Sequence, residues 1–216
     1  MSGPEAKDGT AGVNRATDAA TKAGPTRDTI VDFLGDIFER CGDAGYLGEP
    51  VTMAQHMLQG AWLAEQQGLP EEVIVAALLH DIGHFTSEFG TFSMQDTQDR
   101  YHEDAGAEVL ADFFPSIVTD CVRYHVAAKR YLCATRPSYN DRLSEASKHS
   151  LILQGGPMSP EEVAKFETNP NLERIIQVRY LDEAGKDPEM ITPDYGHFAP
   201  MVRRVVDRHL GPGAEA

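Results

Sequence analysis

In the stretch AALLHDIGHF, residues 76–85, an apolar run ends abruptly in His80, Asp81 and His84. The residues from Val73 to Leu79 are all apolar, and a helix that is apolar on every side is buried. A carboxylate at the end of such a helix is costly to remove from water unless a cation or a strong hydrogen-bond donor compensates its charge. The stretch therefore predicts a central helix that carries a cation-binding or strongly hydrogen-bonded group into the interior.

Helical patterns lie on both sides of this stretch. Ile30, Phe33, Leu34 and Ile37 recur at the spacing of one helical face, and similar faces follow along the chain. We expect helices at about residues 26–41, 52–68, 70–79 and 105–113. One further helix begins near residue 115, another ends at residue 166, and two more cover residues 171–183 and 198–210. The sequence shows no series of alternating strand patterns with hairpin turns, so the expected fold class is all-α. Residues 84–100 are typical of a long loop, which inside a compact domain is usually functional.

Length and charge limit the organisation and the partners. With 216 residues the chain is long enough for one domain and short for two. We expect a flexible tail at 1–26, rich in small and polar residues, and a single domain at 27–216. The 34 acidic and 19 basic residues give a formal charge of −15, which argues against nucleic acid as a partner.

Cysteine usage and hydropathy indicate a compartment. Cys41, Cys121 and Cys133 form no CxxC pair and no even disulfide framework, which suits a reducing environment. The sequence contains neither a signal-peptide pattern nor an apolar run of membrane length. We therefore expect a cytoplasmic protein without a membrane partner, whereas its oligomeric state cannot be read from the pattern.

Five histidines lie in helical contexts beside acidic residues: His56, His80, His84, His102 and His125. Adjacent helical side chains point about 100° apart, so His80 and Asp81 can face two metals, or one can bridge them. Imidazole and carboxylate without thiolate suit iron or manganese and leave zinc and nickel open. The residues alone therefore predict a metal site without choosing its metal or its reaction.

The order of the His and Asp residues is similar to that of the HD superfamily of metal-dependent phosphohydrolases. The motifs YLGE, HDIGH, HVAAKRYL, QGGPM and the Arg-x-x-Asp of RYLDEAGK further resemble the HD-domain phosphonate oxygenases, over about residues 28–210. This resemblance implies an all-α HD-domain helical bundle and a mixed-valent Fe(II)/Fe(III) pair of iron ions, with one residue bridging them. The implied ligands are His56, His80, Asp81 (the bridge), His102, His125 and Asp182.

The same resemblance implies roles for residues around the metals. Tyr46 would occupy an iron position at rest and leave when substrate arrives, and Glu49 would meet the substrate nitrogen, so both are expected catalytic residues. Without the resemblance, the residues alone favour a turn tyrosine and a glutamate at the N-terminus of a helix. The implied substrate-binding residues are Gln55, His84, Lys129, Ser147, Ser150 and Arg179.

The implied reaction uses dioxygen to cleave a carbon–phosphorus bond. We expect the substrate 1-hydroxy-2-(trimethylammonio)ethylphosphonate, which gives glycine betaine and phosphate. The alternative is 2-amino-1-hydroxyethylphosphonate, which gives glycine and phosphate. Aromatic residues in or beside the 84–100 loop could hold a quaternary ammonium by cation–π attraction, or they could only anchor the loop: Phe85, Phe89, Phe92 and Tyr101, with Met94.

Three further interpretations stay open from the sequence. A phosphohydrolase of the same fold would release phosphate without dioxygen. A diiron enzyme resembling myo-inositol oxygenase would share the ligands but would not need a phosphonate clamp of Lys129, Ser147 and Arg179. A regulatory module would hold a structural metal in a closed site.

Overall fold

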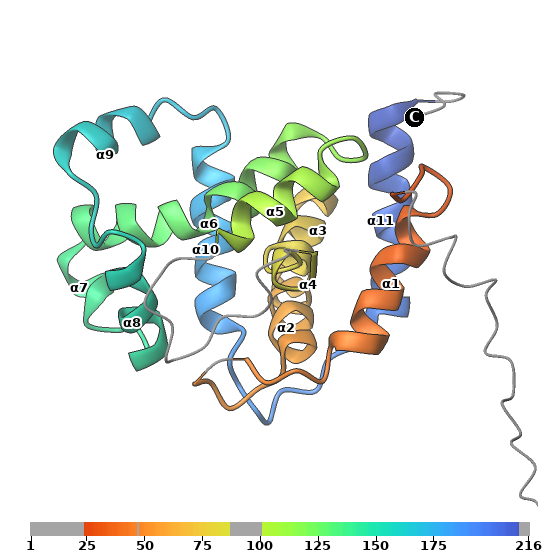
Figure 1. Cartoon of the computed structure of the whole chain (residues 1–216), viewed down its shortest axis with the longest axis horizontal. Coiled ribbons are helices and arrows are strands. Elements are labelled where there is room, and N and C mark those ends of the chain that lie inside the picture. Colours follow the sequence, from red (N-terminus) through yellow and green to blue (C-terminus); the bar gives the residue numbers. More distant parts are fainter. Residues whose placement is uncertain (1–23, 47, 87–100, 212–216) are drawn as a thin grey trace, which may run out of the picture.

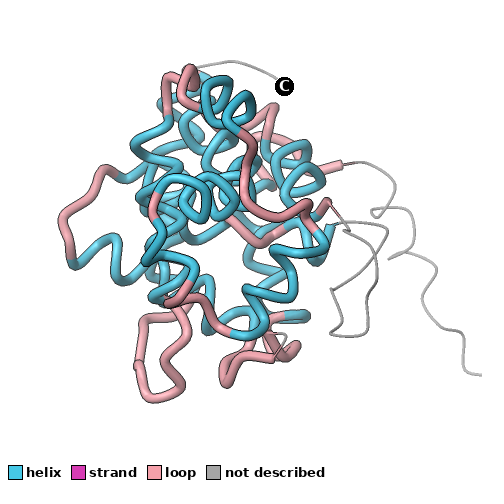
Figure 2. Tube along the Cα trace, turned by 90° about the vertical axis from the view of Figure 1, so that its left-hand side faces the viewer, coloured by secondary structure: helices cyan, strands magenta, loops and turns pink. Residues whose placement is uncertain are grey.

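The computed structural model describes residues 24–46, 48–86 and 101–211, and this part of the chain is helical with connecting loops (Figure 2). In chain order the helices are α1 (Ile30–Cys41), α2 (Met53–Gln66), α3 (Glu71–Leu79), α4 (Gly83–Thr86), α5 (His102–Leu110), α6 (Ser116–Thr135), α7 (Pro137–Asn140), α8 (Glu145–Leu153), α9 (Pro160–Phe166), α10 (Leu172–Ala184) and α11 (Tyr195–Leu210). An isolated antiparallel bridge pairs Gly45 with Thr52. The all-α expectation is confirmed.

Helix α3 is the centre of the molecule. Every residue from Val73 to Leu79 is buried, as the uninterrupted apolar run predicts. Helices α2, α6, α10 and α11 pack around α3 (Figure 1). Because α3 is enclosed on all sides, the residues that follow it, His80 and Asp81, enter the interior rather than the surface.

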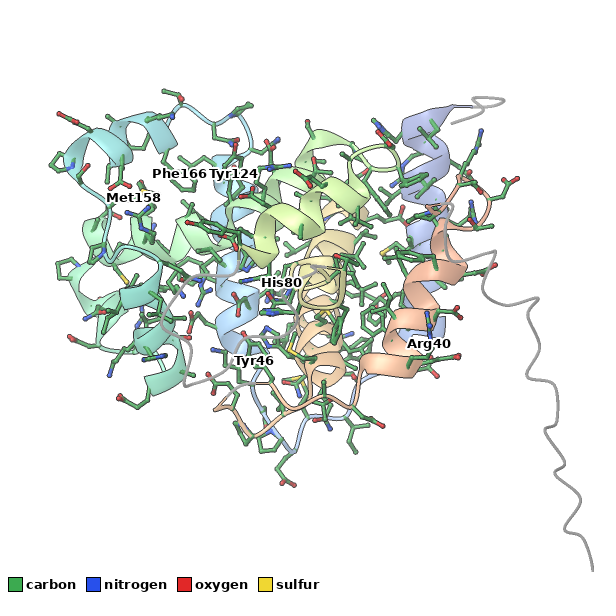
Figure 3. All side chains as sticks on the ribbon, viewed as in Figure 1. Arg40, Tyr46, His80, Tyr124, Met158 and Phe166 are labelled. Atoms are coloured by element: carbon green, nitrogen blue, oxygen red, sulfur yellow. The ribbon has the colours of Figure 1, made fainter. Side chains whose placement is uncertain are left out.

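The remaining helices enclose this centre. Helices α1 and α11 lie side by side at one end of the molecule, and α7, α8 and α9 lie at the other (Figure 1). At that second end, Phe166 of α9 packs against Tyr124 and Tyr131 of α6. Figure 3 shows His80 and Tyr46 near the middle of the molecule, with Arg40 at its periphery. Among the described residues, no helix combines the length and the apolar character needed to cross a bilayer.

The structure refines several sequence-based predictions. The first helix begins at Ile30 rather than near residue 26. Helices α7 and α8 were not predicted, and the expected 84–100 loop starts with the single turn of α4. The rest of that loop, from residue 87, and the expected tail up to residue 23 lie outside the described residues.

A close approach between α4 and α5 fixes the position of His102, the metal-ligand candidate at the start of α5, relative to His80 and Asp81, which precede α4. A Cβ atom added to Gly83 would overlap the carbonyl oxygen of His102 and would lie 2.7 Å from the backbone nitrogen of Gly106. Only glycine allows this contact, because the neighbouring atoms belong to the backbone and cannot rotate away. Gly83 therefore sets how near His102 comes to the end of α3.

We expect Gly83→Ala to lower the free energy of unfolding by about 3 kcal/mol or more, because α4 and α5 must separate. The matched control is Gly60→Ala in α2, where the new Cβ atom would meet Ala77 and Leu181 at 3.5–3.9 Å, which is ordinary contact. That control should be about 0.5–1 kcal/mol more stable than the wild type, since alanine favours a helix. Urea unfolding measures both, and equal stabilities would contradict the close approach.

Candidate metal centre

Five segments deliver the metal-ligand candidates to one buried place. His56 comes from the middle of α2, and His80 and Asp81 follow α3. His102 begins α5, His125 lies in the middle of α6, and Asp182 lies near the end of α10. The exposed fraction of all six residues is between 0% and 8%. All the predicted ligands are therefore brought together away from solvent.

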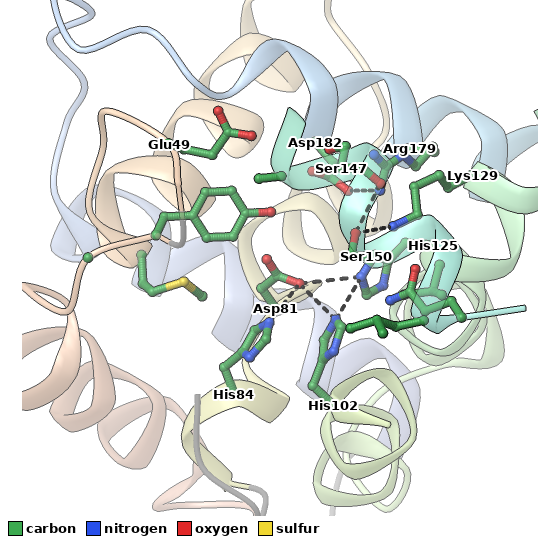
Figure 4. A pocket seen from close by; sticks show the side chains of 17 residues that line it. Glu49, Asp81, His84, His102, His125, Lys129, Ser147, Ser150, Arg179 and Asp182 are labelled. Carbon is green, nitrogen blue, oxygen red and sulfur yellow. Dashed lines mark hydrogen bonds and ion pairs between the residues drawn. The ribbon is translucent and has the colours of Figure 1, made fainter. Parts of the chain in front are cut away.

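Asp81 lies between two pairs of histidines. Its Oδ2 atom is 3.5 Å from His56 Nε2 and 3.6 Å from His80 Nε2. Its Oδ1 atom is 3.3 Å from the Nε2 atoms of both His102 and His125 (Figure 4). The two groups His56–His80–Asp81 and Asp81–His102–His125 can each hold a metal ion. Because each oxygen faces a different pair, the carboxylate can bridge two ions.

Hydrogen bonds to the backbone fix which ring nitrogen of three histidines carries the proton. The Nδ1 atom of His56 donates to the Gly185 carbonyl at 2.8 Å, and that of His80 donates to the Ala77 carbonyl at 2.8 Å. His125 Nδ1 donates to the Val122 carbonyl at 2.7 Å. Since a carbonyl can only accept, each neutral ring presents its Nε2 lone pair to the centre.

These lone pairs face one another. The Nε2 atoms of His56 and His80 are 3.0 Å apart, and those of His102 and His125 are 3.2 Å apart. Two lone pairs at this distance repel unless a cation lies among them. Burial lowers the pKa of His80 to about 4 despite the charge of Asp81, so a proton is not retained there at neutral pH. A metal ion meets the requirement, and the donor set fits one.

Asp182 completes the first group. Its Oδ1 atom is buried, has no hydrogen-bond partner among the described residues, and lies 3.4 Å from His56 Nε2. Its Oδ2 atom accepts a hydrogen bond from Arg179 at 2.6 Å. Burial raises the pKa of Asp182, but the charge of Arg179 and the neighbouring imidazoles of His56 and His80 lower it well below its usual range. The carboxylate is therefore ionised, with one oxygen held and the other free to bind a metal.

The pKa of Asp81 follows the same balance. Burial raises it, whereas His80, His102 and His125 together lower it well below its usual range. The described cysteine thiols, Cys121 and Cys133, belong to neither group. The centre thus offers imidazole nitrogen and carboxylate oxygen to an ion, which agrees with the sequence-based ligand chemistry.

A pocket opens beside the centre. Tyr46, Asp81, His84, His102 and His125 line one side of it. The ring of His84 stacks on that of His102 with centroids 4.0 Å apart, and burial lowers its pKa to about 3. The ring of Tyr46 stacks on that of His56, also at 4.0 Å, and burial with the charges of Asp81 and Asp182 keeps its hydroxyl protonated by raising its pKa. The uncharged rings of His84 and Tyr46 therefore line the side of the pocket next to the metal centre.

Cationic and hydroxyl groups line the other side of the pocket. Lys129 donates to Ser150 Oγ at 2.7 Å, and Ser150 in turn donates to the Ser147 carbonyl at 3.1 Å. Burial, with the charge of Arg179, lowers the pKa of Lys129 to about 7. Figure 4 shows Lys129, Ser150 and Arg179 gathered on one side of Asp81, opposite Glu49. The predicted phosphonate-binding residues therefore lie together within reach of the metal site.

Gln55 is the exception among the predicted substrate-binding residues. Its side chain is exposed, and its Oε1 atom accepts a hydrogen bond from Thr52 N at 2.8 Å. The side-chain oxygen of Thr52 accepts a hydrogen bond from the backbone nitrogen of Gln55, and the two bonds form a capping box at the start of α2. Gln55 is not among the residues that line the pocket. Its position gives it a helix-capping role.

The structure adds site residues that sequence reasoning missed. Glu103 has a carboxylate oxygen 3.4 Å from His102 Nδ1, and this atom has no hydrogen-bond partner among the described residues. Arg179 is oriented by Tyr139, whose hydroxyl accepts from its Nε atom at 2.9 Å, and by an ion pair with Glu183. Lys186 forms an ion pair with Glu49 at 3.0 Å. These pairings join residues distant in the chain or lack a sequence motif.

Comparison with known proteins agrees with this geometry. The family model of the HD domain matches residues 53–176, which include His56, His80, Asp81, His102 and His125. The chain belongs to the HD-domain family. The expected HD-domain helical fold is confirmed.

Two relatives of this chain are named as phosphonate dioxygenases. The chain is 75% identical over 185 residues to a Leisingera caerulea protein named 1-hydroxy-2-(trimethylamino)ethylphosphonate dioxygenase (glycine-betaine-forming), which covers 86% of this chain and 94% of the relative. It is 42% identical over 177 residues to the hydroxymethylphosphonate dioxygenase of Gimesia maris, covering 79% and 87% of the two chains. The resemblance to the phosphonate oxygenases is confirmed.

We expect Asp81→Asn, which keeps the shape of the side chain and removes its charge, to weaken metal binding by at least about 100-fold. Titration of the metal-free protein with Mn(II) measures the affinity, with the heat of binding and the rise in melting temperature as the two readouts. Asp104→Asn is the matched control, because Asp104 of α5 forms a partly exposed ion pair with Arg123 of α6. Wild-type affinity in Asp81→Asn would contradict a metal centre built on this residue.

Proposed function

We propose that this protein is a dioxygenase that converts 1-hydroxy-2-(trimethylammonio)ethylphosphonate into glycine betaine and phosphate. The observation that carries the proposal is a buried His/Asp metal centre that shares one pocket with Lys129, Ser147, Ser150 and Arg179. The 75% identity to the named dioxygenase supports it. The phosphohydrolase and inositol-oxygenase interpretations have no comparable support.

The reaction balances without an external reductant. The C1–P bond and the C1–H bond break, and C1 becomes a carboxylate carbon. One oxygen atom of O₂ enters the carboxylate, the other enters phosphate, and one proton is released. The co-substrate is therefore dioxygen alone, with no further electron donor.

We propose two iron ions, Fe(II) and Fe(III), as the metals. His56, His80 and Asp182 would hold one, His102 and His125 the other, and Asp81 would bridge them. Bound in this way, the iron pair supplies the redox chemistry with dioxygen that cleavage of the bond requires. Imidazole and carboxylate donors suit iron, and the absence of a thiolate among the described ligand candidates agrees with this choice.

The residues around the metals would orient the substrate. Lys129 carries a positive charge when a phosphonate dianion is bound, because the anion offsets the burial that lowers its pKa. The hydroxyls of Ser147 and Ser150 can donate to the remaining phosphonate oxygens, and Arg179 adds positive charge close to Asp182. In this otherwise acidic chain, these groups supply the local charge that attracts the anion.

Tyr46 would act as the gate. Its ring covers His56, and its hydroxyl remains protonated beside Asp81 and Asp182. A substrate that approaches the first metal position must therefore move this ring. Glu49, which lines the same pocket, is the acidic group available to a cationic head group.

The head group of the substrate is the finer part of the proposal. The primary-amine substrate, which gives glycine, is the alternative and would need the same phosphonate and metal contacts. Of the aromatic residues expected to hold a quaternary ammonium, Phe89 and Phe92 lie outside the described residues, as does Met94. The cytoplasmic location also remains a prediction.

Matched aerobic and anaerobic incubations of the iron-loaded enzyme test the proposed function. We expect phosphate and glycine betaine in equal amounts only when dioxygen is present, with one ¹⁸O atom from labelled O₂ in each product. The primary-amine substrate and hydroxymethylphosphonate, assayed in parallel, establish the head-group preference. Equal phosphate release with and without dioxygen would make the protein a phosphohydrolase of this fold and would refute the proposal.

A further inference from the structure

Lys186 follows directly on the segment that orients a metal ligand. The carbonyl of Gly185 accepts the hydrogen bond from His56 Nδ1. Asp187 is joined to Gln59 of α2 by two hydrogen bonds, from its backbone nitrogen at 3.0 Å and to its carbonyl at 2.7 Å. The backbone on both sides of Lys186 is thus fixed to α2, so any movement of this residue is confined to its side chain.

The ammonium group of Lys186 lies among three different kinds of partner. It donates to Glu49 Oε1 at 3.0 Å and to Ser147 Oγ at 3.1 Å. It also lies 5.7 Å from the centre of the Tyr46 ring. The exposed fractions of the Lys186 and Glu49 side chains are only 12% and 9%, so water screens this ion pair weakly.

These three partners make a cation-binding site. A carboxylate, a hydroxyl and an aromatic face are the groups that hold an ammonium ion in proteins. Tyr46, Glu49 and Ser147 all line the pocket, whereas Lys186 is not among its lining residues. Lys186 reaches them from the segment that follows α10 in the chain. The ammonium group of Lys186 thus occupies the cation-binding site beside Glu49 at the edge of the ligand pocket.

We infer that Lys186 is a tethered competitor for the cationic head of the substrate, and that it sets the selectivity between cationic and uncharged hydroxyphosphonates. The inference deepens the proposed function and rests on it. A substrate with an ammonium head must displace the lysine from Glu49. A substrate without a cation leaves the ion pair intact and meets a neutralised carboxylate.

The contacts of Glu49 explain how displacement is possible. Ser144 Oγ donates to Glu49 Oε1 at 2.5 Å, so the carboxylate keeps a partner when the lysine leaves. A trimethylammonium group donates no hydrogen bonds, and it therefore competes for charge and for the Tyr46 face without disturbing Ser144. The observed affinity for the cationic ligand equals the intrinsic affinity multiplied by the fraction of molecules in which Lys186 has left the site.

Anaerobic binding to the metal-loaded enzyme tests this inference without turnover. For Lys186→Met, we expect the Kd of the trimethylammonium hydroxyphosphonate to fall by about tenfold or more, as the competing state is removed. The Kd of hydroxymethylphosphonate should stay unchanged or rise. Lys186→Gln, which keeps a hydrogen-bond donor on a shorter side chain but removes the charge, should behave like Lys186→Met and serves if the methionine variant folds poorly.

Two controls separate the mechanism from general effects. Lys148→Met removes an exposed Lys–Glu pair from α8, and should change neither Kd. In a Glu49→Gln background, Lys186→Met should no longer raise the affinity for the cation. Equal weakening of both ligands would show that Lys186 holds the phosphonate instead, and unchanged affinities would show that it does not compete; either result overturns the inference.

Failure of the proposed function is distinguishable from failure of this inference. If the wild-type enzyme cleaves no hydroxyphosphonate, the proposed function fails. Choline then probes the cation site by itself, and tighter choline binding by Lys186→Met than by wild type would still support a tethered competitor. If wild type cleaves the substrate and Lys186→Met binds no cation more tightly, only the inference fails.

Discussion

The buried carboxylate of Asp81 requires the helices around it to supply compensating groups. A charge with an exposed fraction of 2% persists only when its surroundings compensate it. Four histidine Nε2 atoms lie 3.3–3.6 Å from its oxygens, and they converge there because backbone carbonyls hold the opposite ring nitrogen of three of them. The metals that complete this arrangement would join four helices, so folding and metal binding are coupled.

Helix packing and substrate chemistry meet at the same residues. Gly83 lets α5 approach closely enough for His102 to reach Asp81, and Gly185 both ends α10 and accepts the bond from His56. Arg179 orients Asp182 while it lines the ligand pocket. The chain is strongly acidic overall, yet Lys129 and Arg179 line one pocket and bring positive charge to the place where an anionic substrate needs it.

The sequence predicted this site unevenly, for physical reasons. His80 and Asp81 stand out because polar residues end an apolar helix, whereas His56, His102 and His125 are single helical residues whose role came from the family resemblance. The ion pair of Glu49 with Lys186 joins residues far apart in the chain, so only tertiary packing reveals it. Gln55 was assigned to the substrate by resemblance, although Thr52-x-x-Gln55 is itself a capping-box pattern that predicts its observed position.

In the proposed centre, the Asp81 carboxylate bridges two metal ions that lie between two histidine pairs. Anomalous diffraction at the iron absorption edge, from crystals of the iron-loaded protein, would locate these ions. We expect two peaks, one beside His56, His80 and Asp182 and the other beside His102 and His125, with Asp81 between them. A single peak, or iron bound away from Asp81, would rule out a bridging carboxylate.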